Sequence, residues 1–142
     1  MIEIVNRQRR RQVEIEPWRE FVVRALEKIG VGQGVGVTVA FVSDRTMRAL
    51  NRRFRGRDAT TDVLSFPSDQ AAWEKTEGET LGDVVISIER AAEQAAEHRL
   101  DFNSELAQLI LHGLLHLCGH DHEADDGEMN AMELRLRRRL EI

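Results

Sequence analysis

The feature that most constrains this chain is a histidine-rich run, HGLLHLCGHDH, which begins at His112 and ends at His122. His112 and His116 are four residues apart, so on a helix their side chains lie on the same face. The leucines around them predict that this helix is buried. Gly119 suits the end of the helix, where a residue at positive φ lets the chain turn back towards the two imidazoles. The run therefore predicts three nitrogen ligands, from His112, His116 and His122, around one point.

Three histidine ligands leave a fourth position of a zinc ion open for water, as in catalytic rather than structural zinc sites. The alternative is a set of buried structural histidines, but four of the chain's five histidines lie in this one short run. The spacing also resembles the H-E-x-x-H-x-x-G-x-x-H pattern of metzincin proteases. The exception is Gly113, which stands where those enzymes carry the glutamate that takes a proton from the metal-bound water. We therefore expect a metal hydrolase that is not a standard protease.

Length and composition indicate one globular domain over residues 1–142, because 142 residues with 42% hydrophobic content can bury a core. The single cysteine, Cys118, excludes an intramolecular disulfide and favours a reducing cytoplasm. We expect Cys118 to be a small core residue rather than a nucleophile. The sequence has neither a signal peptide pattern nor an apolar run of membrane-spanning length.

Hydrophobic periodicity and capping signals predict the secondary structure. Strands are expected at residues 2–5, 35–42, 61–66 and 81–88. Helices are expected at residues 17–29, 44–55 and 89–98, from one of Asp101, Asn103 and Ser104 to the glycine stop, and at 123–140. Ser43 or Asp44 and Ser87 are the expected helix N-caps. This order predicts an α+β fold, a single domain with one mixed sheet of about four strands.

A second unusual stretch, NRRFRGRDATTDVLSFP, spans residues 51–67. Four of its arginines surround Phe54, and they are Arg52, Arg53, Arg55 and Arg57. Guanidinium groups match phosphate oxygens, so this cluster suits RNA or another phosphate ligand. The alternative is a solvated helix end whose arginines pair with nearby aspartates. A net charge of −5 argues against nucleic acid, but a local basic surface on an acidic protein is compatible with it.

Taken together, HGLLHLCGHDH, NRRFRGRDATTDVLSFP and LGDVVIS resemble the YbeY family of bacterial endoribonucleases over roughly residues 35–140. The resemblance implies a zincin-like domain whose motif helix packs on a four-stranded sheet. It implies that His112, His116 and His122 bind one zinc ion, or another divalent transition metal. His120, which replaces the family's usual aromatic residue, is an alternative ligand. Arg55 matches the family's functionally important arginine.

The resemblance also implies the biological role, which is a metal-dependent endoribonuclease that prefers single strands. It would act in 16S rRNA 3′ end maturation and ribosome quality control in the cytoplasm, with RNA and the ribosome as partners and no DNA or membrane. Arg55 would hold the scissile phosphate, and Arg52, Arg53 and Arg57 would contact the RNA backbone. Asp121 would orient a ligand imidazole or, alternatively, act as the general base, which Gly113 leaves unassigned. One alternative is a non-catalytic ribosome-binding factor with a structural zinc. Another is a peptidase with a different base, which Gly113 disfavours.

Overall fold

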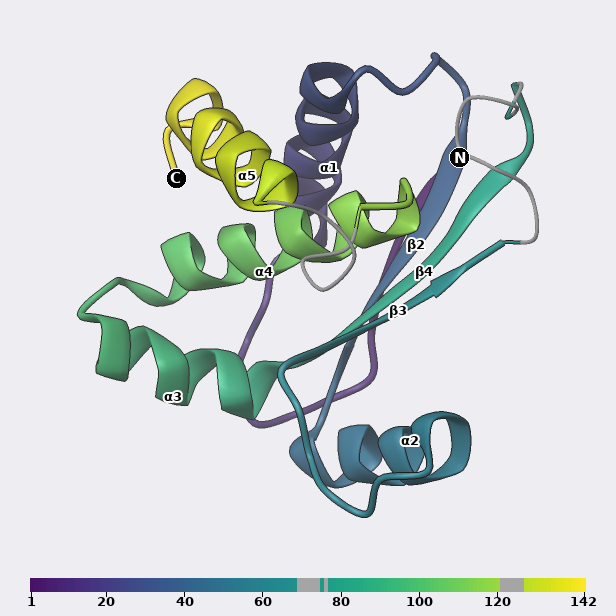
Figure 1. Ribbon diagram of the computed structural model, residues 1–142. Helices are drawn as coiled ribbons and strands as arrows, with labels where there is room; N and C mark the ends of the chain where they lie inside the picture. The colour runs from purple at the N-terminus through teal and green to yellow at the C-terminus, as the bar shows by residue number, and fades with distance from the viewer. Residues whose placement is uncertain (69–74, 76, 121–126) are drawn as a thin grey trace.

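The computed structural model describes residues 1–68, 75, 77–120 and 127–142. It has an α+β fold with one four-stranded sheet and five helices in the described part of the chain (Figure 1). In chain order the elements are β1 (Ile2–Asn6), α1 (Ile15–Ile29), β2 (Gly36–Val42), α2 (Asp44–Arg55), β3 (Val63–Pro67), β4 (Thr80–Ser87), α3 (Ile88–His98), α4 (Phe102–Leu117) and α5 (Glu128–Leu140). None of the described helices is long and apolar enough to cross a bilayer.

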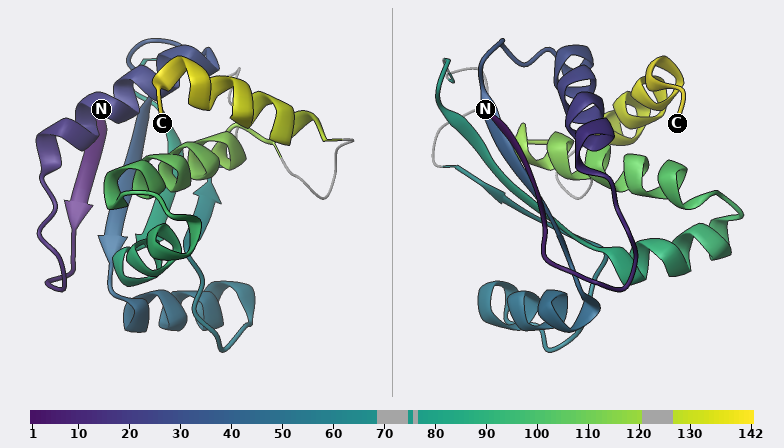
Figure 2. Two further views of the ribbon diagram at one scale, coloured as in Figure 1. Left: turned by 90° about the vertical axis from the view of Figure 1, so that its left-hand side faces the viewer. Right: turned by 180° about the vertical axis from the view of Figure 1, so that it is seen from behind.

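The sheet has the strand order β1-β2-β4-β3. β1 pairs with β2 and β2 with β4 in parallel, whereas β3 runs antiparallel to β4 at one edge. The sheet is therefore mixed, as the sequence predicted. Because side chains alternate between the faces of a strand, the sheet separates two apolar clusters. The larger cluster lies between the sheet and helices α1, α3, α4 and α5, and the smaller one lies under α2. Figure 2 shows α2 well apart from α1, α4 and α5.

The smaller cluster fixes α2 and its arginines against the sheet. Met47 of α2 is fully buried against residues of β2, β3 and β4. The helix begins after Ser43, whose side chain accepts a hydrogen bond from the Thr46 backbone amide, and it ends at Gly56 in the left-handed conformation. Serine at this position and glycine at the end satisfy backbone groups that the helix itself leaves unpaired. The last turn of α2 therefore presents its arginines at a defined place beside β3.

Helix α4 runs through the centre of the molecule and is buried along most of its length. Asp101 is the N-cap and accepts a hydrogen bond of 2.7 Å from the Ser104 backbone amide, which selects one of the three expected starts. At the other end Gly119 has a φ of +92°, and the amide of His120 donates to the Leu115 carbonyl. This hydrogen bond and the one from Gly119 to the His116 carbonyl form a Schellman motif. The predicted turn after the helix is thus present.

Gly113 allows α4 to approach the sheet closely. A Cβ atom at this position would lie 2.6 Å from Cγ1 of Val84 and 3.3 Å from Cγ2 of Val63. Val84 is fully buried, so it has little room to move away. The position where metzincin proteases carry a catalytic glutamate therefore faces β3 and β4 and has no space for a side chain.

Several expected boundaries differ from the structure, most of them by one or two residues, and the starts of β3 and α5 have clear local causes. β3 begins at Val63 rather than at residue 61, because the Asp62 side chain accepts a hydrogen bond from the Val63 amide and ends the preceding loop. α5 begins at Glu128 rather than at 123, because Gly127 is the N-cap in the left-handed conformation. Residues 123–126 lie outside the described residues.

Candidate metal centre

The last two turns of α4 hold His112 and His116 side by side. Their Nε2 atoms are 3.0 Å apart, and the ring centroids are 4.6 Å apart with an interplanar angle of 73°. A separation of four residues on a helix brings the two imidazoles to the same face, as the sequence predicted. The two rings therefore present their Nε2 nitrogens to one point.

The orientation of His112 is set by a buried carboxylate from α5. Oε1 of Glu133 lies 2.7 Å from Nδ1 of His112, and only 5% of Glu133 is exposed. The other carboxylate oxygen accepts a hydrogen bond of 2.6 Å from Nη2 of Arg137, one turn further along α5. A carboxylate at Nδ1 favours the tautomer with its hydrogen there and leaves the Nε2 lone pair for a metal ion.

The histidine pair fits a zinc ion. Zinc–nitrogen bonds of about 2.0–2.1 Å place two nitrogens of a tetrahedral site roughly 3.3 Å apart, close to the observed 3.0 Å between the two Nε2 atoms. Without metal, the same separation suits an N–H···N hydrogen bond from His116 to His112. The carboxylate at Nδ1 of His112 is the usual outer partner of a histidine that binds zinc. The spacing and the donor type of the pair are therefore compatible with a bound metal ion.

The expected third ligand, His122, and the expected orienting residue, Asp121, lie outside the described residues. Across residues 1–68, 75, 77–120 and 127–142, no group of three histidine, cysteine or acidic side chains is placed to hold a metal. His120 is described and partly buried. Its backbone forms the turn that follows α4.

Arg55 lines the same pocket as the two histidines. Its Nη2 donates a hydrogen bond of 2.8 Å to the carbonyl of Ser65 in β3. The Ser65 hydroxyl in turn donates to the carbonyl of Gly113, between the two histidines of α4, over 3.1 Å. β3 therefore connects the arginine of α2 to the histidine helix through two hydrogen bonds.

A pocket of about 680 Å³ brings these groups together along the edge of β3. Its polar lining includes the two histidines with Arg55, Arg57, Asp62 and Ser65. Two guanidinium groups thus share one cavity with two imidazoles. Cations beside a metal-binding pair suit a ligand with dense negative charge, such as a phosphodiester.

The other two predicted arginines point elsewhere. Arg52 lines a shallow depression with Arg45, Arg48 and Asp58. Arg48 donates a hydrogen bond of 3.0 Å to Asp58, and this bond lowers the pKa of the carboxyl group, with smaller contributions from the charges of Arg48 and Arg52. For this part of α2, the structure matches the alternative from the sequence, in which exposed arginines at the helix end pair with a nearby aspartate. Arg53 lies over the ring of Phe54. Among the four arginines, Arg55 and Arg57 line the histidine pocket, whereas Arg52 and Arg53 extend the basic surface of α2.

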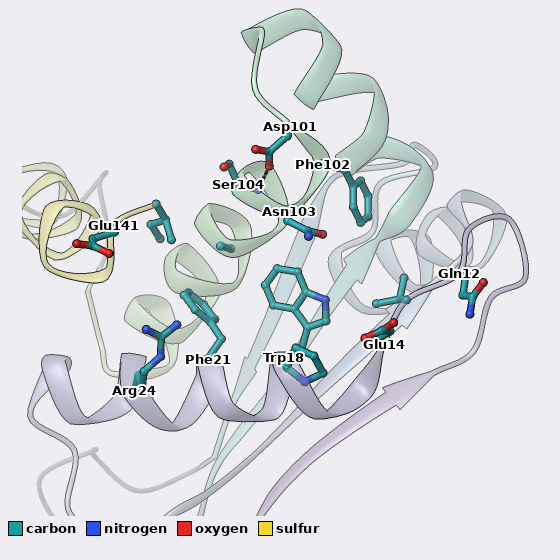
Figure 3. Close-up of a pocket in the computed structure, with 14 residues that line it drawn as sticks. Gln12, Glu14, Trp18, Phe21, Arg24, Asp101, Phe102, Asn103, Ser104 and Glu141 are labelled. Atoms are coloured by element: carbon teal, nitrogen blue, oxygen red, sulfur yellow. Dashed lines mark hydrogen bonds between the residues drawn. The ribbon is translucent and has the colours of Figure 1, made fainter.

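A second pocket, of about 550 Å³, lies at the other end of α4, between that helix and α1. Trp18, Phe21 and Phe102 contribute its aromatic lining (Figure 3). Its Asp101 carboxylate already accepts the capping hydrogen bond from the Ser104 amide, which lowers the pKa of Asp101. Among the described residues, the lining contains neither histidine nor cysteine, which distinguishes this cavity from the first pocket.

Cys118 does not provide a nucleophile. The residue packs against the main core, and burial raises the pKa of its thiol to about 11. A thiol with such a pKa is protonated at neutral pH and reacts poorly. The prediction of a small core residue is confirmed.

Sequence patterns did not identify Glu133, Ser65 or Asp62 as parts of this region. Glu133 is far from His112 in the sequence and meets it only because α5 packs on α4. The only sequence signal for Glu133 is that an acidic residue lies beside the apolar stripe of α5. A carboxylate buried there needs a hydrogen-bonding or charged partner.

Comparisons with known proteins show which family and fold the chain resembles. The family model described as Endoribonuclease YbeY matches residues 3–141. The chain is 48% identical to the Endoribonuclease YbeY of Koribacter versatilis, over 86% of this chain and 74% of that protein. It is 39% identical to the one of Clostridioides difficile, over 90% and 86% respectively. The solution structure of TM1509 from Thermotoga maritima superposes with a TM-score of 0.62 and 29% identity, covering 99% of this chain and 89% of that one.

Proposed function

The chain belongs to the YbeY family of endoribonucleases, and from this premise we propose that it cleaves RNA at the pocket between α4 and β3. Its enzyme class is that of a hydrolase acting on RNA phosphodiester bonds. The observation that carries the proposed location is the convergence of His112, His116 and Arg55 on one cavity. The whole of residues 1–142 would act as one catalytic domain.

The proposed cofactor is one zinc ion per chain, or another divalent transition metal. His112 and His116 would supply two ligands, and His122 the third, by its match to the family motif. When bound, such an ion supplies Lewis acidity towards a phosphate oxygen and a water molecule of lowered pKa. Glu133, at 2.7 Å from Nδ1, would hold the imidazole of His112 in the tautomer that binds metal through Nε2. Asp121 stays a candidate for the same role at another imidazole.

The chain's own cations would position the substrate. Arg55, fixed by the Ser65 carbonyl, would bind the scissile phosphate and stabilise the additional charge of its transition state. Arg57, the second arginine that lines the pocket, would contact the same phosphate or a neighbouring one. Arg52 and Arg53 would bind the RNA backbone along α2, contacts that give affinity rather than sequence readout.

The proposed biological substrate is precursor rRNA, with cleavage at the 3′ end of 16S rRNA and a role in ribosome quality control. rRNA processing is consistent with the family. The ribosome is the proposed partner and the cytoplasm the proposed location, with neither DNA nor membrane as a partner. A single-strand preference suits an open pocket at the edge of a sheet, where phosphates are reached without base readout.

The alternatives are less well supported. A non-catalytic assembly factor with a structural zinc is not favoured, since the relatives are endoribonucleases. A peptidase would need another base, because the space for a glutamate at position 113 is taken by Val63 and Val84.

A cleavage assay on a single-stranded fragment from the 3′ end of 16S rRNA tests the proposal. We expect His116→Ala to abolish cleavage and Arg55→Ala to reduce it by about 10²- to 10³-fold, as for loss of a charge-stabilising donor. Arg24→Ala is the control, because Arg24 lies on α1 and lines the other pocket. Full activity of His116→Ala, with the control also active, would contradict the proposed site.

A further inference from the structure

Phe54 is an unusually exposed aromatic residue on a basic helix. It is 54% exposed, whereas the large apolar side chains of the core are below 10%. The residues on either side of it are Arg53 and Arg55, both exposed at the end of α2. Leaving this ring in water has a free-energy cost that a shorter polar side chain would avoid.

The ring of Phe54 is supported from the sheet. It meets Phe66 of β3 edge to face, with centroids 5.4 Å apart and an interplanar angle of 71°. Phe66 in turn packs against the small cluster under α2. An aromatic side chain has only two rotatable bonds, so this contact restricts the orientations of the ring.

Two guanidinium groups flank the aromatic pair. The Arg53 guanidinium lies 5.2 Å from the centroid of Phe54, and that of Arg55 lies 5.6 Å from the centroid of Phe66. Arg55 also donates to the Ser65 carbonyl and lines the histidine pocket. One residue therefore joins the exposed aromatic pair to the proposed phosphate site.

The edge of the sheet provides the path between the two sites. β3 is an edge strand, and its side chains alternate between the faces. Ser65 points towards α4 and the histidines, whereas Phe66 points towards α2. Arg55 lines the histidine pocket and lies beside Phe66, and Phe66 contacts Phe54, so the pocket and the exposed ring lie on either side of this edge.

We propose that Phe54, supported by Phe66 and flanked by Arg53 and Arg55, is a stacking site for one unpaired base of single-stranded RNA. The base belongs to a nucleotide beside the cleaved bond, so this inference rests on the proposed function. Every base has a π face, and stacking on aromatic rings next to arginines is the common mode of sequence-tolerant binding of single strands. A base within a duplex is stacked on its neighbours and cannot take this place, so the site selects unpaired RNA.

The test compares Phe54→Leu with wild type for binding to a short single-stranded RNA, with and without an abasic nucleotide beside the cleavage point. Leucine retains apolar contact with Phe66 but has no ring for stacking. We expect the intact RNA to bind Phe54→Leu about tenfold more weakly than wild type. The abasic RNA should bind both proteins equally. Val23→Ala, which alters an exposed apolar residue on α1, is the control and should bind as wild type does.

A second variant keeps the inference testable if Phe54→Leu folds poorly. Phe54→Trp places a fluorophore at the site, and its emission above the wild-type background should be quenched by intact RNA and not by the abasic strand. Equal affinity of Phe54→Leu and wild type, or an equal loss on both RNAs, would overturn the stacking site. Cleavage of the same RNA by wild type is measured separately. Absence of cleavage with base-dependent binding at Phe54 would count against the proposed function alone.

Discussion

Glu133→Gln is the substitution that best tests how the structure prepares its metal site. Glutamine has nearly the same volume, so the buried position stays filled and no cavity forms. The change removes the negative charge that lies 2.7 Å from Nδ1 of His112 and 2.6 Å from the Arg137 guanidinium. The amide of glutamine can also present its NH₂ group to Nδ1, which would select the other tautomer and place the hydrogen on Nε2.

The expected effect is a loss of metal affinity rather than loss of the fold. Removing the outer partner of a histidine ligand typically lowers metal affinity or activity by about 10- to 100-fold. This corresponds to roughly 1.4–2.8 kcal/mol of binding free energy. We expect Glu133→Gln to lie in this range, because the carboxylate is buried and water cannot replace it.

Competition with a chromogenic zinc chelator measures this affinity directly. Glu128→Gln is the matched control, since Glu128 is an exposed acid in the first turn of the same helix. Its affinity for zinc should equal that of wild type. Equal affinities of Glu133→Gln and Glu128→Gln would refute the argument that Glu133 orients His112 for metal.

Three further predictions concern packing, pH and electrostatics. Gly113→Val should lower the free energy of unfolding by about 1–3 kcal/mol through overpacking against the sheet, and an unchanged urea midpoint would contradict the close approach of α4. The hydrogen bond to buried Glu105, followed by its charge, raises the pKa of His98 above 6.5. Its stabilising effect is therefore fully present below the unfolded pKa of about 6.5 and is lost as pH rises through the folded value. Hence His98→Gln should destabilise the protein at pH 5 more than at pH 9 in thermal unfolding, and an equal difference at both pH values would disprove this. Arg55→Gln should reduce the slope of log affinity against log salt for single-stranded RNA by about 0.7, whereas Arg24→Gln, in the other pocket, should leave the slope unchanged.

The elements of the fold were predictable because their signals are local. Ser43 and Ser87 accept hydrogen bonds from amides three residues ahead, and Gly119 adopts the positive φ that ends a helix with a Schellman motif. Such caps depend on a few adjacent residues, so sequence suffices to place them. The sequence also predicted the shared helix face of His112 and His116, since spacing alone determines it.

The parts that sequence could not predict depend on how elements pack. Glu133 reaches His112 only because α5 crosses α4, and the crossing is set by the whole core. Packing also decides which arginines line the histidine pocket and which lie outside it. Adjacent positions on a helix point about 100° apart, so the orientation of α2 on the sheet decides which guanidinium enters the pocket. The role of Gly113 follows likewise from the distance between α4 and the sheet.

The measurement that tests the central claim most directly is a zinc titration of chelator-stripped protein, with cleavage of the single-stranded fragment from the 3′ end of 16S rRNA as the readout. The account predicts no cleavage without metal and a rise that saturates near one ion per chain. It also predicts that His112→Ala stays inactive at the same zinc concentrations, because the substitution removes one proposed zinc ligand and leaves Glu133 without an imidazole to orient. Cleavage at the full rate by the stripped protein, or by His112→Ala, would contradict a metal-dependent nuclease centred on this histidine pair.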